Sequence, residues 1–332
     1  MASWQEIDFD SLKNYTSDLD QINDSYNNLY STTESNSHTF KSPVKNQASQ
    51  KSLKKLYDRV NQIQPENLDE ELRKRNLSTR GELGIRRCRL QHHLKLELMF
   101  ECENPLNMIE QPFDYIAVLD FEATCEENAG KNYQNEIIEF PIVLIDVKQQ
   151  AIIDKFHSYC QPAIKPILSK FCTQLTGIKQ RQVDDAPLFF DVLHNVETWL
   201  YERNLLSSTK QHKFAFATDG PWDFRNFLQI QCRLSSIPYP SWAEQWIDIR
   251  KGFAEFYSVK RTGINKMLHK LGLDFDGRPH SGIDDAINIA RITVELLKEG
   301  CVLSFNDGIH KSSSEHAANA EVNEKDRVVF ED

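Results

Sequence analysis

The sequence predicts a domain of the α/β class, in which helices cover a mixed sheet, with a small helical module in front of it. Within residues 113–305, three strand patterns come first and helical patterns then alternate with one further strand, an order typical of a layered domain. Residues 51–97 instead show leucines at helical spacing. We assign residues 98–112 to the connection between these two parts.

The composition is typical of a soluble globular protein with some disordered sequence. The chain has 332 residues, 40% of them hydrophobic and 27% charged, with a formal net charge of −10. No apolar run approaches the roughly 20 residues that cross a bilayer, so we expect no membrane contact. The N-terminus lacks a signal-peptide pattern, and none of the seven cysteines forms a Cys-x-x-Cys pair. We therefore expect reduced thiols and a cytoplasmic protein, with the nucleus as a second location.

Both ends of the chain are polar and acidic. Residues 1–50 carry seven acids against three bases and few large apolar side chains. Residues 306–332 contain a Ser-Ser-Ser run and again seven acids against three bases. Segments of this composition cannot bury enough apolar surface to fold, so both are predicted to be disordered.

The helical module differs from the rest of the chain in charge. Residues 51–96 hold twelve Lys and Arg against six Asp and Glu, a net of +6. One interpretation is a charged helical linker whose basic side chains are solvated. The other is a module that offers basic side chains to phosphates, and its candidates are Arg80, Arg86, Arg87 and Arg89.

The elements of the large domain follow from hydrophobic periodicity and turn residues. The first three strands are separated by short turns and are expected to form an antiparallel meander. A helix, a strand and three further helices follow, the last one ended by Gly300. The expected strands are 115–123, 135–147, 151–162 and 213–219, and the expected helices are 186–204, 221–236, 263–272 and 281–300.

Acidic residues stand on faces that are otherwise apolar. Asp120 and Glu122 lie two residues apart on a strand and so project from the same face. Two such charges repel each other at low dielectric and need a positive partner. Asp223 shares a helical stripe with apolar residues, namely Phe227, Ile230 and Leu234.

The last helix contains two adjacent acids, and its hydrophobic periodicity predicts which of them is buried. Asp284 lies on a polar stripe, whereas Asp285 shares its stripe with Ile289, Ile292 and Leu296. Asp285 is therefore predicted to point into the protein. Asp219 ends a strand, and both an inward position and a turn or helix-cap role are open for it.

Acids from separate elements that converge on one strand end predict a magnesium or manganese site. Hard cations prefer carboxylate oxygens. Two such ions about 4 Å apart suit hydrolysis at phosphorus. His280, five residues before Asp285, has an ordinary pKa near neutrality and is a candidate proton acceptor for the attacking water.

These residues resemble a known family. Asp120-x-Glu122, Trp222-Asp223 and His280-x-x-x-x-Asp285 resemble the DEDDh branch of the DnaQ-like 3′-to-5′ exonucleases, which have an RNase H-like fold. The blocks "DFEATC", "EIIEFP", "FCTQLTGI", "DGPWDF" and "GRPHSGIDDAINIAR" resemble the Eri-type exoribonucleases in particular. Residues 51–97 resemble a SAP module, a helical unit that binds nucleic acid.

The resemblance implies roles for individual residues. Asp120, Glu122, Asp223 and Asp285 would bind two Mg²⁺ or Mn²⁺ ions, and His280 would be the general base. The residues implied to hold the terminal base are Phe171, Leu175 and Trp222; for Phe171, plain core packing is an alternative.

The resemblance also implies the substrates. They are small interfering RNA and the 3′ ends of structured RNAs such as 5.8S ribosomal RNA, including single-stranded overhangs, stem-loops and short duplexes. A ribosome or another RNA–protein complex is a further expected partner. Two other functions stay open on the sequence alone: a DNA-directed exonuclease and a catalytically silent RNA-binding adaptor.

Overall fold

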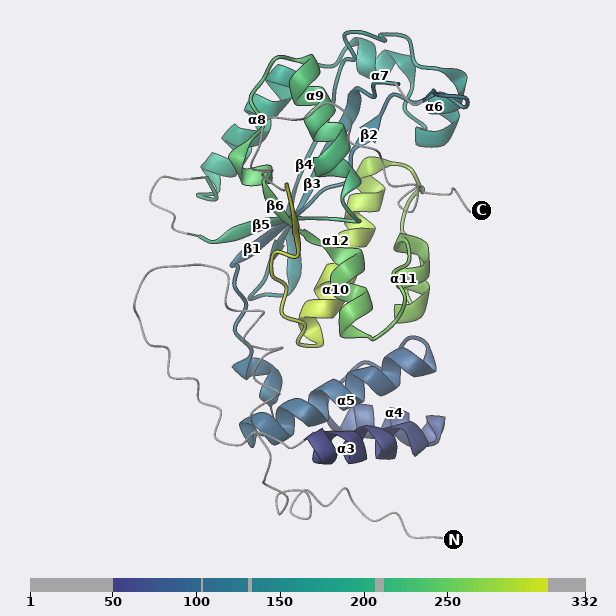
Figure 1. The fold of residues 1–332 in the computed structure, drawn as a ribbon, viewed down its shortest axis with the longest axis vertical. Coiled ribbons are helices and arrows are strands. Elements are labelled where there is room, and N and C mark those ends of the chain that lie inside the picture. The colour runs from purple at the N-terminus through teal and green to yellow at the C-terminus, as the bar shows by residue number, and fades with distance from the viewer. Residues whose placement is uncertain (1–49, 103, 131–132, 207–211, 310–332) are drawn as a thin grey trace, which may run out of the picture.

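A computed structural model describes residues 50–102, 104–130, 133–206 and 212–309 (Figure 1). Most of the predicted N-terminal tail, residues 1–49, and residues 310–332 of the predicted C-terminal tail lie outside these ranges. Within them, no helix is both long enough and apolar enough to span a bilayer.

A seven-stranded mixed sheet forms the centre of the large domain. The third strand pairs antiparallel with the first, second and fourth. The fifth strand runs parallel to the first, and the sixth runs parallel to the fifth. The strands are β1 (Tyr115–Val118), β2 (Glu122–Ala123), β3 (Ile137–Asp146), β4 (Ala151–Tyr159), β5 (Phe214–Thr218), β6 (Gln245–Asp248) and β7 (Asp307–Gly308).

Helices cover both faces of this sheet, as the alternation along β1 shows. Ile116 and Val118 pack in one core with residues of α10, α11 and α12. Ala117 and Leu119 point the other way and pack in a second core with residues of α8 and α9. Figure 1 shows the two layers. The helices are α8 (Phe189–Glu202), α9 (Gln229–Leu234), α10 (Ile249–Phe256), α11 (Ile264–Leu271) and α12 (Gly282–Lys298).

The predicted strands and long helices are present, except that the strand predicted over 115–123 is divided into β1 and β2 by residues 119–121. Several short elements are additional. These additions include β6, β7, α10, α6 (Lys170–Thr176) and α7 (Gln180–Asp184). The helix predicted over 221–236 begins as a π-helix, Asp223–Leu228, and continues as α9. The sheet places the strands in the RNase H-like arrangement that the resemblance implies.

The predicted C-terminal tail begins too early by four residues. β7 pairs antiparallel with β6, and the N–H groups of Asn306 and Ile309 on either side of it donate to the carbonyls of Trp246 and Glu244. Residues 306–309 are therefore hydrogen-bonded to the β6 segment. Asp307 forms ion pairs with Lys251, at 2.5 Å, and with Arg225. Two basic side chains that converge on one buried carboxylate explain why this acidic residue is part of the domain.

The N-terminal part forms three helices: α3 (Gln50–Gln62), α4 (Pro65–Lys74) and α5 (Leu83–Phe100). They enclose a small core of their own, made of Leu56, Val60, Leu68, Leu72, Leu90 and Leu94. The segment predicted as a connection is packed against the large domain. Within it, the Gln111 side chain donates a hydrogen bond to the carbonyl of Cys301 and accepts one from the N–H of Leu303.

Helix α5 also contacts the large domain directly. Ile85 is part of the core that includes α10–α12. The ring of His92 stacks on Phe256, with centroids 4.3 Å apart. Arg89, 2% exposed, pairs with Glu299 at 2.6 Å. The three helices and the large domain therefore share a packed interface.

Candidate active site

Four carboxylates meet at the carboxyl ends of β1 and β5. Asp120 is the second residue after β1, Glu122 begins β2, Asp223 begins the π-helix and Asp285 lies in the first turn of α12. The carboxyl ends of parallel strands share one edge of a sheet, where ligand sites of α/β folds commonly lie. The convergence of the four predicted acids is thus a direct result of the topology.

The chain breaks its strand pairing at this point. Residues 119–121 separate β1 from β2, and the register of β2 on β3 shifts between Glu122 and Ala123. The freed N–H of Phe121 donates to the Asp223 carboxylate at 2.8 Å. This bond connects the segment between Asp120 and Glu122 to the π-helix. It therefore fixes the position of Asp223 relative to these two acids.

Burial and mutual repulsion raise the pKa of every acid in the cluster. Burial raises the pKa of Asp120 well above its usual range, and the charges of Asp223 and Asp285 add to the effect. Burial also raises the pKa of Glu122, with contributions from Asp285 and Glu139. For Asp223 and for Asp285, burial raises the pKa to about 7. Such a cluster is electrostatically unfavourable without a cation.

The donor set fits divalent cations. Ligand atoms of Glu122, His280 and Asp285 lie within 4.8 Å of one another. Asp120 and Asp223 add further carboxylate oxygens, the donors that hard ions such as Mg²⁺ and Mn²⁺ prefer. The metal-binding prediction from the sequence is therefore compatible with the geometry.

His280 stands at the rim of this cluster. Its side chain is exposed, and its backbone adopts the left-handed conformation with φ of 61°. The Asp285 carboxylate accepts a hydrogen bond from the backbone N–H of His280. Partial burial, followed by the charge of Arg278, lowers the pKa of the imidazole. The ring is therefore neutral at pH 7 and able to accept a proton.

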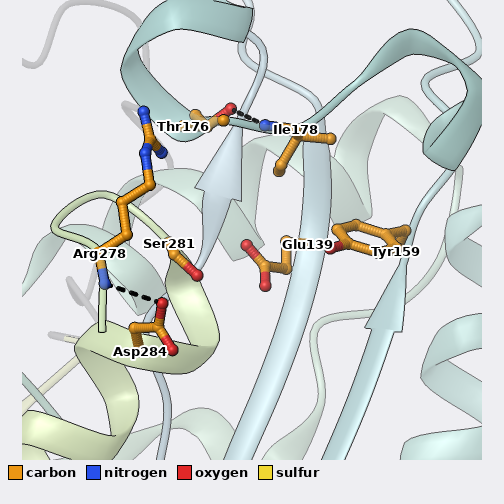
Figure 2. A pocket seen from close by; sticks show the side chains of 8 residues that line it. Glu139, Tyr159, Thr176, Ile178, Arg278, Ser281 and Asp284 are labelled. Atoms are coloured by element: carbon orange, nitrogen blue, oxygen red, sulfur yellow. Dashed lines mark hydrogen bonds between the residues drawn. The ribbon is translucent and has the colours of Figure 1, made fainter. Parts of the chain in front are cut away.

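The two adjacent acids of α12 differ in burial, as their positions on the polar and apolar stripes of the helix predict. Asp285 is 6% exposed and belongs to the acidic cluster. Asp284 accepts a hydrogen bond from the backbone N–H of Arg278 at 3.0 Å. It lines a hollow of about 140 Å³ beside the cluster, shown in Figure 2 with Glu139, Tyr159, Thr176, Ile178, Arg278 and Ser281.

Two acids near the cluster were not assigned a role from the sequence. Asp219 has an inward position, with its side chain 4% exposed and paired with Arg250 through two bonds of 2.7 Å. Glu139, 1% exposed, accepts hydrogen bonds from the N–H of Gly282 at 2.9 Å and from His157 at 2.7 Å. The sequence indicated an inward position only for Asp219, because it ends a predicted strand, and gave no such indication for Glu139.

The three residues predicted to hold a base are available for contact. Phe171 and Leu175 lie four residues apart on α6, on one helical face. Trp222 directly precedes Asp223. All three are partly exposed, and none belongs to the hydrophobic cores of the described residues. Plain core packing therefore does not account for Phe171.

The four predicted RNA-binding arginines all make intramolecular contacts. Arg86 pairs with Asp69 at 2.5 Å, and Arg87 donates to the carbonyl of Ile63 at 3.2 Å. For Arg89 the prediction is wrong, because its buried guanidinium is occupied by Glu299 and by two carbonyls. Arg80 pairs with Glu295 at 3.4 Å, but its side chain is 54% exposed.

Comparison with known proteins identifies the family to which this fold and this site belong. The family model described as Exonuclease matches residues 117–293, a range that contains all five predicted catalytic residues. A 3′-5′ exoribonuclease 1 of Rattus norvegicus is 44% identical over 253 residues, which are 76% of this chain and 72% of the relative. The chain belongs to the Eri1-type 3′-5′ exoribonucleases.

Other relatives of this exoribonuclease agree. The 3′-5′ exonuclease eri1 of Schizosaccharomyces pombe is 40% identical over 210 residues, covering 58% of this chain and 71% of the relative. A solved nuclease domain, a DEDDh family member bound to rAMP, is 47% identical with a TM-score of 0.58. It covers 60% of this chain and 100% of its own. The reaction class is therefore 3′-5′ exonucleolytic hydrolysis of RNA, and neither the DNA-directed enzyme nor the silent adaptor is supported.

Proposed function

We propose that this exoribonuclease uses two Mg²⁺ or Mn²⁺ ions and releases 5′-mononucleotides from RNA 3′ ends. Asp120, Glu122, Asp223 and Asp285 would hold the ions. Four clustered carboxylates support this assignment, because the pKa of each is raised and two of them, Asp223 and Asp285, are buried. When bound, divalent ions supply Lewis-acid stabilisation of the charge that develops on the phosphate oxygens.

His280 acts as the general base in this proposal. It takes a proton from the attacking water, whose oxygen forms a bond to the terminal phosphorus. The bond from that phosphorus to the 3′ oxygen of the preceding nucleotide breaks, so the product carries a 5′-phosphate. The lowered pKa of His280 and its place beside Glu122 and Asp285 support this role.

Phe171, Leu175 and Trp222 hold the terminal base by stacking and apolar contact. Each stacked base contributes about 1–3 kcal/mol, and an aromatic face accepts any base. This predicts little sequence preference at the 3′ end. Partial exposure of all three side chains supports the assignment.

The substrates we propose are single-stranded 3′ overhangs, stem-loops and short duplexes. They include small interfering RNA and the 3′ end of 5.8S ribosomal RNA, with a ribosome or another RNA–protein complex as the setting. A relative of 46% identity has a structure described as 3′-end specific recognition of histone mRNA stem-loop by 3′-exonuclease. We further propose that residues 51–97 act as a SAP-like module that binds nucleic acid, with Arg80 as the arginine accessible to phosphates. The location we propose is the cytoplasm, with the nucleus as a second location.

End-labelled oligonucleotides test the proposal. Single-stranded RNA, a stem-loop with a 3′ tail, a duplex with 3′ overhangs and a matched DNA strand are incubated with Mg²⁺ or with EDTA. We expect 5′-mononucleotides from the RNAs in Mg²⁺, none in EDTA, and none from Asp120→Asn. Nucleosides or 3′-phosphates as products would contradict the proposed bond cleavage, and undiminished cleavage in EDTA would contradict the metal requirement.

A further inference from the structure

One segment of the large domain is basic in an otherwise acidic chain. The whole sequence holds 49 Asp and Glu against 39 Lys and Arg. Residues 256–273, however, contain no acid and four basic residues: Lys260, Arg261, Lys266 and Lys270. This separation of charge concentrates positive potential on and next to α11.

The basic side chains lie on the outer face of the segment. Helix α11 buries Met267, Leu268 and Leu271 against the core and leaves Asn265, Lys266 and His269 exposed. Lys260 and Arg261 are exposed in the stretch that leads into the helix. Within the described residues, neither of these two forms an ion pair with an acid.

The N-terminal end of α11 lies near the catalytic acids. A Cβ on Gly263, the residue before the helix, would stand 3.9 Å from the guanidinium of Arg250. Arg250 in turn pairs with Asp219, whose charge raises the pKa of Asp120 and of Asp223. Lys260 and Arg261 lie in the segment between Tyr257, which contacts Cys88 of α5, and Gly263, which lies beside Arg250. This segment therefore runs from the N-terminal module towards the catalytic end of the domain.

The C-terminal end of α11 contacts the N-terminal helices. The carbonyl of Lys270 accepts a hydrogen bond from the N–H of Glu82 at 2.8 Å, and the Lys270 ammonium pairs with the Glu82 carboxylate at 2.8 Å. Figure 1 shows α11 beside α12, and α5 lies beyond one end of α11. Helix α11 thus connects the catalytic end of the large domain to the N-terminal module.

We propose that Lys260, Arg261 and Lys266 form a strip that binds the phosphates of the RNA strand upstream of its terminal nucleotide. The proposal rests on the proposed function, which places the terminal nucleotide at the acidic cluster. An eight-residue helix is about 12 Å long, and successive phosphates of a helical strand rise about 3.4 Å. The strip ends at Lys266, the third residue of α11, so its three charges contact about three phosphates, and the rest of α11 leads from there towards the module.

This geometry makes a length-dependent prediction. A dinucleotide occupies the catalytic site but does not reach along α11, whereas a twelve-nucleotide RNA does. Removing the strip is expected to weaken binding of the long RNA and leave the dinucleotide unaffected. Each lost phosphate contact on a single strand also lowers the log–log salt dependence of binding by about 0.7.

The experiment compares Lys260→Gln/Arg261→Gln with a matched control, Lys148→Gln/Lys213→Gln. The control removes the same number of charges at the opposite end of the sheet, in the β3–β4 turn and before β5. Affinity for a twelve-nucleotide RNA is measured over a salt series, with Asp285→Asn added to both proteins and to the reference so that no RNA is cleaved. We expect the strip variant to lose five- to twenty-fold in affinity and about 1.4 in salt slope, and the control to match the reference.

Kinetics on two substrate lengths complete the test. With Asp285 restored, kcat/KM of the strip variant should fall for the twelve-nucleotide RNA and stay unchanged for the dinucleotide. An affinity and a salt slope equal to those of the control would overturn the proposal. An equal loss on both substrates would also overturn it, because the effect would then lie at the catalytic site. Failure of the unaltered protein to cleave RNA would instead reject the proposed function.

Discussion

The Glu139 carboxylate, on β3, accepts a hydrogen bond from the backbone N–H of Gly282 at 2.9 Å and so holds the first residue of α12. The approach is close: a Cβ on Gly282 would lie 2.6 Å from the carbonyl of Asp120. His280 stands two residues before this contact and Asp285 three residues after it. Glu139 thus positions the general base and one proposed metal ligand against Asp120.

Glu139→Ala is therefore expected to lower kcat and to raise the Mg²⁺ concentration needed for half-maximal activity. It leaves a buried N–H without an acceptor, which costs about 1–3 kcal/mol. A shift of the α12 start by about 1 Å would lower kcat roughly a hundred-fold. The matched control is Glu127→Ala, an exposed acid after β2. A stability loss with unchanged kcat and unchanged Mg²⁺ dependence would show that Glu139 is purely structural.

Substitution of the neighbouring residues Asp284 and Asp285 tests which of them is a metal ligand. Asp285→Asn removes a charged ligand from the acidic cluster and is expected to lower kcat at least a hundred-fold. Asp284→Asn keeps an oxygen that can accept the hydrogen bond from Arg278, so its activity should stay within about two-fold of the unaltered protein. Single-turnover cleavage of labelled RNA measures both. A reversed order of effects would contradict the assignment of Asp285 as a ligand.

The acidic cluster predicts an unusual pH dependence of stability without metal. The pKa of Asp223 and of Asp285 is about 7 in the folded protein, against 3.8 as the ordinary value. Between these values the folded state binds protons that the unfolded state has released, so the free energy of unfolding falls as pH rises from 3.8 to 7. In EDTA, the protein should be less stable at pH 8 than at pH 5.5, by on the order of 2 kcal/mol for each of these two carboxyls.

Asp223→Asn provides the comparison for this effect. The variant has one titrating carboxyl fewer and still offers an oxygen to the N–H of Phe121. Its unfolding free energy in EDTA should therefore fall less between pH 5.5 and pH 8. Mg²⁺ should stabilise the unaltered protein at pH 8 more than the variant, by mass action on the folded state. Identical pH profiles of the two proteins, from urea unfolding, would refute the electrostatic account.

Long elements with a clear hydrophobic pattern were predictable from the sequence. The stripe on α12 correctly separated Asp284 from Asp285, which is buried and belongs to the acidic cluster. Asp120 and Glu122 do lie in one cluster, but the single strand predicted for them is interrupted at residues 119–121. Short elements were not predictable in this way. β6 has four residues, three of them buried, and such a segment is too short to show a period. Its position follows from pairing with β5, which is a tertiary property.

The remaining differences involve partners that are distant in the sequence. Glu139 lies 143 residues from Gly282, and its bond is made to a backbone N–H, which has no residue-specific signal. Arg89 stands among basic neighbours on α5, so sequence position alone favoured a surface role. Its burial depends on Glu299, which is 210 residues away. Local patterns identify which residues are unusual, whereas partners at such distances require the fold.

The buried pair of Arg89 and Glu299 allows a test of how the module is held. Burial raises the pKa of Glu299, and Arg89 opposes this effect, while the Tyr257 hydroxyl donates to the same carboxylate at 2.7 Å. Arg89→Met would leave a buried carboxylate without its cation, which costs about 3–5 kcal/mol. Arg80→Met breaks a more exposed pair and should cost about 1 kcal/mol or less.

Adding Glu299→Met to Arg89→Met should recover most of the lost stability, because no unpaired charge then stays buried. Urea unfolding of the two single variants and the double variant measures the coupling between the two side chains. Additive losses, or equal losses for Arg80→Met and Arg89→Met, would show that this pair does not hold α5 against the large domain. The expected recovery would show that Arg89 and Glu299 are energetically coupled across the interface between α5 and the large domain.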